Sequence, residues 1–194
     1  MRRRVLLAAL AVTMIGVIGC GPAAQRFSAV DITGAPSFGS DFRLTDHTGK
    51  VRTLVDFHGK VVAVFFGFTF CPDVCPTTLA EMRQVMQQLG PKGEKLQVLF
   101  VTVDPQRDTP ALLSKYMAAF HPSFLALYGD AAATRKVAND FKIVARIVPG
   151  QSSDTYTVDH TAGTLIFDTQ GRLRLMAPYG LGVDKLTADI KQLM

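Results

Sequence analysis

The chain has 194 residues, a formal net charge of +5, three cysteines and no tryptophan. This length suits one domain with a full hydrophobic core, and an apolar content of 48% excludes a disordered chain. Three cysteines are too few for a small scaffold held together by disulfides, and an odd number means that they cannot all serve the same role.

The N-terminal segment has the organisation of a secretory signal. Three arginines at 2–4 precede an apolar run over 5–18, which is shorter than the ~20 residues that a membrane-spanning helix needs. The sequence VIGC, which ends at Cys20, resembles the lipobox of bacterial lipoproteins, in which the cysteine is acylated. We therefore expect a signal peptide at 1–19 and a tether at 20–29 that begins at an acylated Cys20. A plain signal peptide with a coincidental cysteine is the alternative.

Removal of residues 1–19 would change the charge balance. It takes away three arginines and no acidic residue, which leaves 18 basic and 16 acidic residues and a net charge of +2. The remaining chain has no basic run and no stripe of arginines and aromatic residues of the kind that binds nucleic acid. We therefore expect no nucleic-acid partner.

The first predicted elements after the tether are a hairpin, a strand and a helix. Residues 42–45 and 51–55 flank a turn that contains glycine, which is typical of a hairpin. Residues 61–66 form a continuous apolar run, which predicts a strand buried on both faces. The helix that follows ends near residue 90. We interpret Met82 and Met86 on its apolar face as core residues, because a methionine stripe is far more often core than a copper site.

Strands continue to alternate with helices and end in a hairpin and a helix, which predicts one α/β domain. Thr109 is the expected N-cap of a helix that has Pro110 as its first residue. A polar loop is expected at 149–157. The predicted strands are 96–103, 124–128, 143–147, 164–167 and 172–176, and the predicted helices are 110–120, 131–141 and 183–194.

Cys71 and Cys75 lie between the strand and the helix that follows it. At a helix N-terminus, peptide dipoles and free N–H groups favour the thiolate over the thiol. Cβ atoms four residues apart on a helix are about 5–6 Å apart, wider than the ~3.5–4.5 Å of a disulfide, whereas one metal ion between two sulfurs tolerates that gap. The pair is therefore suited to metal and capable of redox chemistry. Two soft sulfurs completed by an imidazole favour Cu(I) or Zn. A permanent structural disulfide is the alternative.

Four histidines could supply the imidazole. His47 lies in the predicted hairpin turn, His58 in a loop and His121 just after a helix, and we interpret each as a solvated loop residue or a helix cap. His160 follows the polar loop and leads into a strand, so its loop can return beside the helix N-terminus that carries the cysteines. Spacing alone leaves His160 open between a ligand and a structural histidine. Asp159 could orient the ring or adjust the local charge.

Three segments resemble the signature segments of the SCO/SenC family, in order and at familial spacing. They are FGFTFCPDVCPTTL at 66–79, VTVDPQRDTP at 101–110 and VDHTAGTLIFD at 158–168. Members of this family are thioredoxin-like copper-binding proteins involved in the assembly of cytochrome c oxidase. The resemblance covers roughly residues 30–194 and implies that this range is a thioredoxin-like, copper-binding domain with an N-terminal hairpin and inserted elements.

The resemblance also implies roles for individual residues. Matched by position, Cys71 and Cys75 correspond to the family's copper-binding cysteines and His160 to its histidine ligand. Phe70 stands where many members have a histidine, for which no ligand role is known. We interpret the DPQRDTP segment as a strand end and a helix cap, and assign it no catalytic role. The family further implies a membrane anchor on the extracytoplasmic side, here an acyl group, which places the protein at the periplasmic face of a membrane in the bacterial cell envelope.

The function implied by the resemblance is that of a membrane-anchored copper metallochaperone. Its partner would be subunit II of cytochrome c oxidase, at the binuclear copper site, and its copper donor is unknown. Oxidation of Cys71 and Cys75 to a disulfide would abolish thiolate ligation. The alternative is a thiol–disulfide reductase that keeps the partner's copper cysteines reduced, an enzyme that needs the two cysteines but not His160. A peroxidase is disfavoured, because Phe68 and Pro72 stand where a peroxiredoxin has a threonine three residues before its reactive cysteine.

Overall fold

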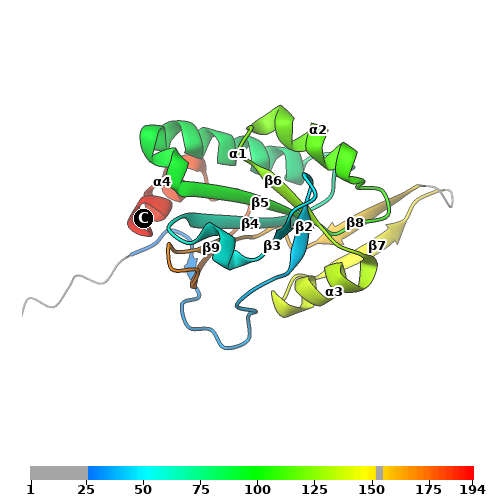
Figure 1. Ribbon diagram of the computed structural model, residues 1–194, viewed down its shortest axis with the longest axis horizontal. Coiled ribbons are helices and arrows are strands. Elements are labelled where there is room, and N and C mark those ends of the chain that lie inside the picture. The colour runs from blue at the N-terminus through cyan, green and yellow to red at the C-terminus, as the bar shows by residue number, and fades with distance from the viewer. Residues whose placement is uncertain (1–25, 152–154) are drawn as a thin grey trace, which may run out of the picture.

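A mixed sheet of eight strands forms the centre of the molecule (Figure 1). The computed structural model describes residues 26–151 and 155–194, so the expected signal peptide and Cys20 lie outside the described residues. The strand order is β1-β10-β9-β4-β5-β6-β2-β3, and β7 pairs with β8 in a separate two-stranded sheet. The strands are β1 (Val30–Asp31), β2 (Leu44–Asp46), β3 (Val51–Arg52), β4 (Val61–Gly67), β5 (Leu96–Thr102), β6 (Leu125–Tyr128), β7 (Ala145–Pro149), β8 (Tyr156–His160), β9 (Thr164–Phe167) and β10 (Leu173–Ala177).

In the described part of the chain, four α-helices cover the two faces of the sheet. Figure 1 shows α1, α2 and α4 on one face and α3 on the other, and short 3₁₀ turns, η1 and η2, precede β4 and β5. This arrangement confirms the predicted α/β class. The helices are α1 (Val74–Leu89), α2 (Pro110–Phe120), α3 (Ala131–Asp140) and α4 (Val183–Gln192), and the 3₁₀ turns are η1 (Leu54–Phe57) and η2 (Gly90–Lys95).

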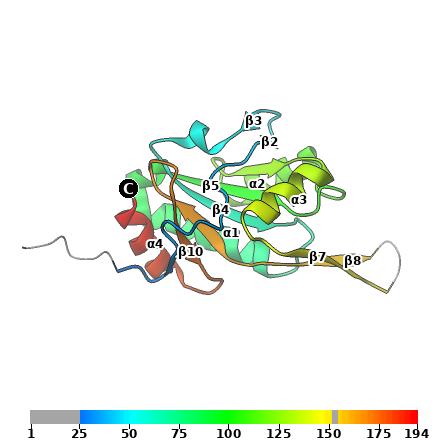
Figure 2. The same ribbon diagram turned by 90° about the horizontal axis from the view of Figure 1, so that it is seen from below.

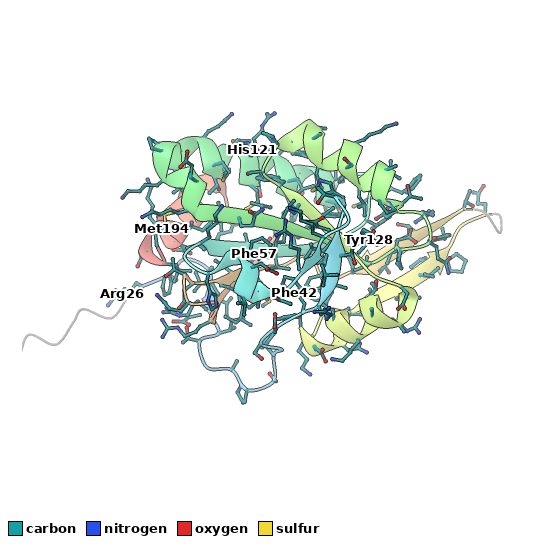
Figure 3. All side chains as sticks on the ribbon, viewed as in Figure 1. Arg26, Phe42, Phe57, His121, Tyr128 and Met194 are labelled. Atoms are coloured by element: carbon teal, nitrogen blue, oxygen red, sulfur yellow. The ribbon has the colours of Figure 1, made fainter. Side chains whose placement is uncertain are left out.

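The central strands β4 and β5 pair in parallel, and every residue of both is buried. Successive side chains of a strand point to opposite faces, so β4 contributes to two cores. Val61 and Phe65 pack into the core under α1, α2 and α4. Phe66 packs into the second core under α3, to which Phe42 and Phe57 also belong (Figure 3). The continuous apolar run in the sequence therefore did mark a strand buried on both faces.

The helix predictions are confirmed at the positions that carry clear signals. Met82 is fully buried and Met86 packs against the same core, so both methionines are core residues. The Thr109 hydroxyl accepts a hydrogen bond from the Leu112 N–H at 3.3 Å, as expected of an N-cap, and Pro110 is the first residue of α2. Within residues 26–151 and 155–194, no helix is long and apolar enough to cross a membrane.

Two predictions of secondary structure were wrong. The second strand of the N-terminal hairpin stops at Arg52, because residues 54–57 form η1, whose start is fixed by a hydrogen bond from the Thr53 N–H to the Asp56 carboxylate at 2.7 Å. The expected polar loop at 149–157 includes parts of an antiparallel pair, in which β7 and β8 align from Ala145–His160 to Pro149–Tyr156. Figures 1 and 2 both show this β7–β8 hairpin extending away from the main sheet.

Candidate metal centre

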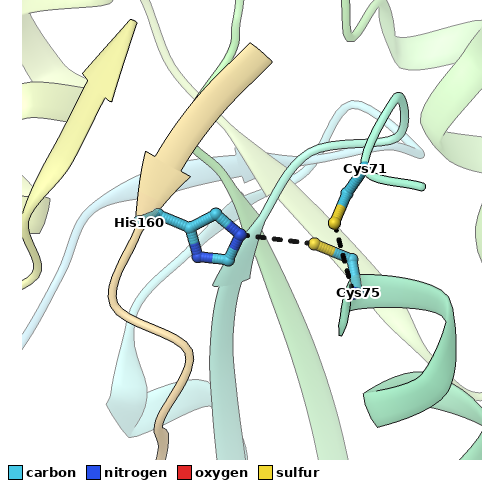
Figure 4. Close-up of side chains that lie close together, drawn as sticks. All are labelled: Cys71, Cys75 and His160. Atoms are coloured by element: carbon cyan, nitrogen blue, oxygen red, sulfur yellow. Dashed lines mark hydrogen bonds between the residues drawn. The ribbon is translucent and has the colours of Figure 1, made fainter. Parts of the chain in front are cut away.

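The side chains of Cys71, Cys75 and His160 meet at one point of the structure (Figure 4). Their ligand atoms all lie within 4.8 Å of one another, and His160 Nε2 is 3.4 Å from Cys75 Sγ. Spacing alone left His160 undecided, and the fold brings it to the cysteines. Among the residues that the structure describes, this is the one group of cysteine, histidine or acidic side chains with such a geometry.

The cysteines are positioned by the turn between β4 and α1. The Cys71 N–H donates to the Phe68 carbonyl at 3.2 Å, which closes the turn, and α1 then begins at Val74. The Cys75 N–H donates to Cys71 Sγ at 3.4 Å, so the first sulfur caps the first turn of the helix. Gly67 makes room for this packing, because a Cβ there would lie 2.9 Å from Cys75 Sγ.

His160 is held by contacts on both sides of its ring. It is the last residue of β8, and its Nδ1 lies 3.1 Å from the Thr161 carbonyl, to which it donates if it carries the proton. That tautomer leaves the lone pair of Nε2 directed at the sulfurs. The rings of Phe65 and Phe68 each pack edge-on at 5.9 Å. Burial lowers the pKa of His160, which favours the neutral imidazole that binds metals.

Asp159 does not orient the His160 ring, contrary to one sequence-based interpretation. Its carboxylate is exposed and forms an ion pair with Arg146 at 3.4 Å on the hairpin. Successive residues of a strand point to opposite faces, so the neighbours Asp159 and His160 in β8 do not share a side. Asp159 does act through its charge, which raises the pKa of His160 against the larger effect of burial.

The expectation of a thiolate at the helix N-terminus is wrong for Cys75. Its side chain is completely buried, and burial raises the pKa of the Cys75 thiol far above its ordinary value. Desolvation of a charged sulfur therefore outweighs the backbone hydrogen bond at Phe68 that lowers the pKa of Cys75. Cys71 is partly exposed, so the two cysteines differ in burial. Metal binding at Cys75 would release the thiol proton.

The other three histidines lie outside this cluster, as the sequence indicated. His47 Nδ1 accepts a hydrogen bond from the Ala126 N–H at 3.1 Å, and His58 is exposed next to Gly171. His121 follows α2, and its Nδ1 lies 2.8 Å from the Ser123 hydroxyl. His47 and His121 therefore have local structural roles, and His58 is an exposed loop residue.

The DPQRDTP segment contributes more to the site than the strand end and helix cap expected from the sequence. Asp108 is buried, and its carboxylate accepts hydrogen bonds from the hydroxyls of Thr69 and Thr102, both at 2.6 Å, and from the Thr69 N–H. It therefore fastens the turn before Cys71 to the end of β5. The available signal was a group of charged residues directly after a central strand that is buried throughout.

The donor set and its spacing fit a soft metal ion. Three ligand atoms in a trigonal arrangement around one ion, with bonds of about 2.3 Å, are about 4.0 Å apart. The three atoms are within 4.8 Å of one another, so closing around an ion needs each pair to approach by less than about 1 Å. Two sulfurs and one imidazole, without a carboxylate, favour copper or zinc over hard ions such as magnesium or calcium.

Comparison with known proteins agrees with this geometry. The bovine mitochondrial SCO2 homolog is 35% identical over 156 residues, which cover 79% of this chain and 59% of the relative. The apo Sco1 protein of Thermus thermophilus is 39% identical with a TM-score of 0.77, covering 89% of this chain and 99% of that one. ScoI of Bradyrhizobium japonicum, solved with copper bound, is 38% identical with a TM-score of 0.74, covering 81% and 99%.

These likenesses confirm the expected thioredoxin-like α/β fold. The chain spans about three fifths of the length of the bovine relative. The family model described as SCO1/SenC matches residues 30–194, a range that contains Asp108 and all three ligand candidates, Cys71, Cys75 and His160. Because this match covers residues 30–194, well over half of the chain, the chain belongs to the SCO1/SenC family.

Proposed function

We propose that the protein is a copper metallochaperone that carries its ion between Cys71, Cys75 and His160. The observation that carries this proposal is the convergence of two sulfurs and one imidazole nitrogen within 4.8 Å, in a chain 38% identical to a protein solved with copper bound. The cargo is a copper ion, which the cysteines bind as thiolates. The three residues come from two segments of the chain, so an ion at this point would join the β8 strand to the start of α1.

The difference in exposure between the two cysteines supports transfer by stepwise exchange of ligands. Cys71 is partly exposed, whereas Cys75 is fully buried. An incoming thiolate from a partner would reach the ion on the Cys71 side and replace that sulfur first. Cys75 and His160 would hold the ion until the partner has supplied further ligands. A three-ligand site leaves room for this shared intermediate.

We propose that the recipient is the binuclear copper site of subunit II of cytochrome c oxidase. The support is membership of a family involved in the assembly of this oxidase. We further propose that Cys20 is acylated after cleavage of residues 1–19, which would hold residues 30–194 at the periplasmic face of a bacterial membrane. The support is the order of basic, apolar and small residues before Cys20. Mass spectrometry of the native N-terminus tests this anchor, since a mature chain that does not begin with a lipid-modified Cys20 would contradict it.

Titration with Cu(I) tests the metal site. We expect the purified, reduced protein to bind one copper ion per chain in competition with a chromophoric chelator. His160→Ala should weaken binding by about tenfold or more, the effect seen when a metal site loses a contributing group. His121→Ala is the matched control and should leave the affinity unchanged. Absence of stoichiometric binding, or binding unaffected by His160→Ala, would contradict the proposal.

A second function, that of a thiol–disulfide reductase, is favoured by one observation. Cys71 is partly exposed and its sulfur lies 3.4 Å from the backbone nitrogen of Cys75, so a partly exposed cysteine stands beside a buried one. Cys71 would attack the partner's disulfide and Cys75 would then release the partner, leaving a Cys71–Cys75 disulfide and two reduced thiols on the partner. A reductase assay separates the functions, because this activity should survive His160→Ala and be lost in Cys71→Ser.

A further inference from the structure

The loop after β5, residues 103–109, contacts both parts of the candidate metal centre, and we call it the bridging loop. On one side, the Asp108 carboxylate binds the Thr69 N–H and hydroxyl in the turn that leads to Cys71. On the other side, Asp104 and Arg107 bind Tyr156, the first residue of the strand that ends at His160. The two metal-binding segments are thus tied to the same loop.

Arg107 makes the larger share of the contacts with the His160-bearing strand. Its Nη1 donates to the Tyr156 carbonyl at 2.9 Å, and its Cζ lies 3.5 Å from the centroid of the Tyr156 ring. Its Nε donates to the Asp104 carboxylate, which also accepts the Tyr156 hydroxyl at 2.8 Å. Asp104, Arg107 and Tyr156 therefore form a closed set in which each contacts the other two.

The same guanidinium lies against the cysteine-bearing turn. Its Cζ is 4.8 Å from the centroid of the Phe70 ring and 5.7 Å from that of Phe68. Phe70 immediately precedes Cys71, and Phe68 packs edge-on against the His160 ring. Arg107 Nη2 is buried and has no hydrogen-bond partner among the described residues, and the rings of Phe68, Phe70 and Tyr156 lie against the guanidinium. Arg107 thus spans the space between the two segments.

The β7–β8 hairpin has few other contacts that would fix its position. No residue of β7 is buried, and Val158 is the one buried residue of β8. A two-stranded hairpin is marginally stable by itself, so its orientation depends on the contacts at its base. His160 lies at the end of this hairpin, and any movement of β8 would move the imidazole relative to the sulfurs.

We propose that Arg107 is a positioning residue that fastens the His160-bearing hairpin to the cysteine-bearing turn. It does not contact the metal, and acts by holding His160 at the distance where it can bind an ion shared with Cys71 and Cys75. The positioning of His160 for an ion rests on the proposed copper-binding function. The fastening of the hairpin to the cysteine-bearing turn concerns the metal-free protein and is tested separately.

Hydrogen exchange of the metal-free, reduced protein tests the fastening. In Arg107→Met, the amides of β8 should exchange about tenfold faster, because loss of the hydrogen bonds and of the stacked cation favours local opening. Arg146→Met is the matched control: Arg146 lies on the same hairpin, is 76% exposed and pairs only with Asp159 among the described residues. It should leave β8 exchange unchanged. Unchanged exchange in Arg107→Met, or an equal increase throughout the main sheet, would overturn the inference.

A second variant covers the case in which Arg107→Met does not fold. Tyr156→Phe removes the hydrogen bond to Asp104 and keeps the ring under the guanidinium. It should accelerate exchange in β8 by a smaller factor of about three, while the central strands β4 and β5 stay protected. Arg107→Lys retains the charge without the fork that binds two acceptors, so it should not restore the wild-type exchange rate.

A double-mutant cycle with copper tests whether Arg107 acts through His160. Arg107→Met should lower the Cu(I) affinity about tenfold in the wild-type background. In the His160→Ala background it should lower the affinity by less than about twofold, because the imidazole that Arg107 positions is already absent. Equal losses in both backgrounds would overturn the coupling to His160. If the wild-type protein binds no copper, the proposed function fails. Hydrogen exchange of the metal-free protein then still tests whether Arg107 holds the hairpin in place.

Discussion

His160 Nε2 lies 3.4 Å from Cys75 Sγ, although 85 residues separate the two in the sequence. The Thr161 carbonyl occupies the other ring nitrogen, so the imidazole presents a lone pair to a thiol that still carries its proton. In the metal-free protein, that proton stands where a metal ion would bind. The centre is therefore closed by tertiary structure and by a hydrogen bond that copper must replace.

The protonation of Cys75 predicts how stability depends on pH. The ordinary pKa of the thiol, 9.0, applies to the unfolded chain, and burial raises it in the folded protein. The folded protein therefore keeps a proton that the unfolded chain loses above pH 9. The free energy of unfolding should be insensitive to this group below that pH and should fall above it, by up to about 1.4 kcal/mol per pH unit.

Urea denaturation of the reduced, metal-free protein at a series of pH values measures this effect. Cys75→Ala should abolish the decline between about pH 9 and 10, whereas Cys71→Ala, in which the buried thiol remains, should retain it. Burial also raises the pKa of Tyr116, but its ordinary value of 10.0 confines its contribution to higher pH. A decline that persists unchanged in Cys75→Ala would refute this assignment.

Gly67 predicts a link between backbone packing and metal affinity. A Cβ at this position would lie 2.8 Å from the Phe100 ring and 2.9 Å from both Cys75 Sγ and the Phe65 ring. We expect Gly67→Ala to lower the free energy of unfolding by about 1–3 kcal/mol and to weaken copper binding, because the sulfur is displaced. Gly163→Ala is the control, since its new Cβ would approach the flexible Met176 side chain at 3.2 Å. Comparable losses of copper affinity in both variants would argue against a specific role of Gly67.

The parts of the fold that could be predicted from the sequence are those with one dominant local signal. The apolar run of β4 must be buried on both faces, and Thr109 before Pro110 fixes the start of α2. Only part of the β7–β8 hairpin could be predicted: a strand was expected at 143–147, but four of the five residues of β7 are exposed and the polar composition of 149–157 indicated a loop. Its pairing is visible only in three dimensions.

The candidate site divides in the same way. Cys71 and Cys75 could be identified from their spacing at a strand–helix junction, whereas His160 became a ligand candidate through family resemblance and is placed by the fold. Asp108 and Arg107 were missed, because their partners Thr69 and Tyr156 are 39 and 49 residues away. The sequence pattern of a strand end and helix cap was correct locally and carried no information about these contacts.

Asp108 predicts a loss of both stability and metal affinity. Asp108→Ala would leave the Thr69 N–H and the hydroxyls of Thr69 and Thr102 without their acceptor. We expect a loss of about 1–3 kcal/mol in the free energy of unfolding, and weaker copper binding because the turn before Cys71 is released. Asp140→Ala, which removes an exposed pair with Lys136, should change stability by less than about 0.5 kcal/mol. Unaltered copper affinity in a folded Asp108→Ala protein would contradict a role in holding this turn.

Met82 and Met86 predict a separation of stability from metal binding. Met82 is fully buried under the sheet, and Met86 is only partly buried one turn further along α1. Met82→Ala should lower the free energy of unfolding by about 2–5 kcal/mol, because it opens a cavity in the core, and Met86→Ala should lower it less. Copper titration of both variants, under conditions where they remain folded, should still give one ion per chain with wild-type affinity. Neither side chain lies in the cluster formed by Cys71, Cys75 and His160, which is the reason to expect no effect on binding. A change in stoichiometry or affinity in either variant would instead mean that a thioether takes part in copper binding.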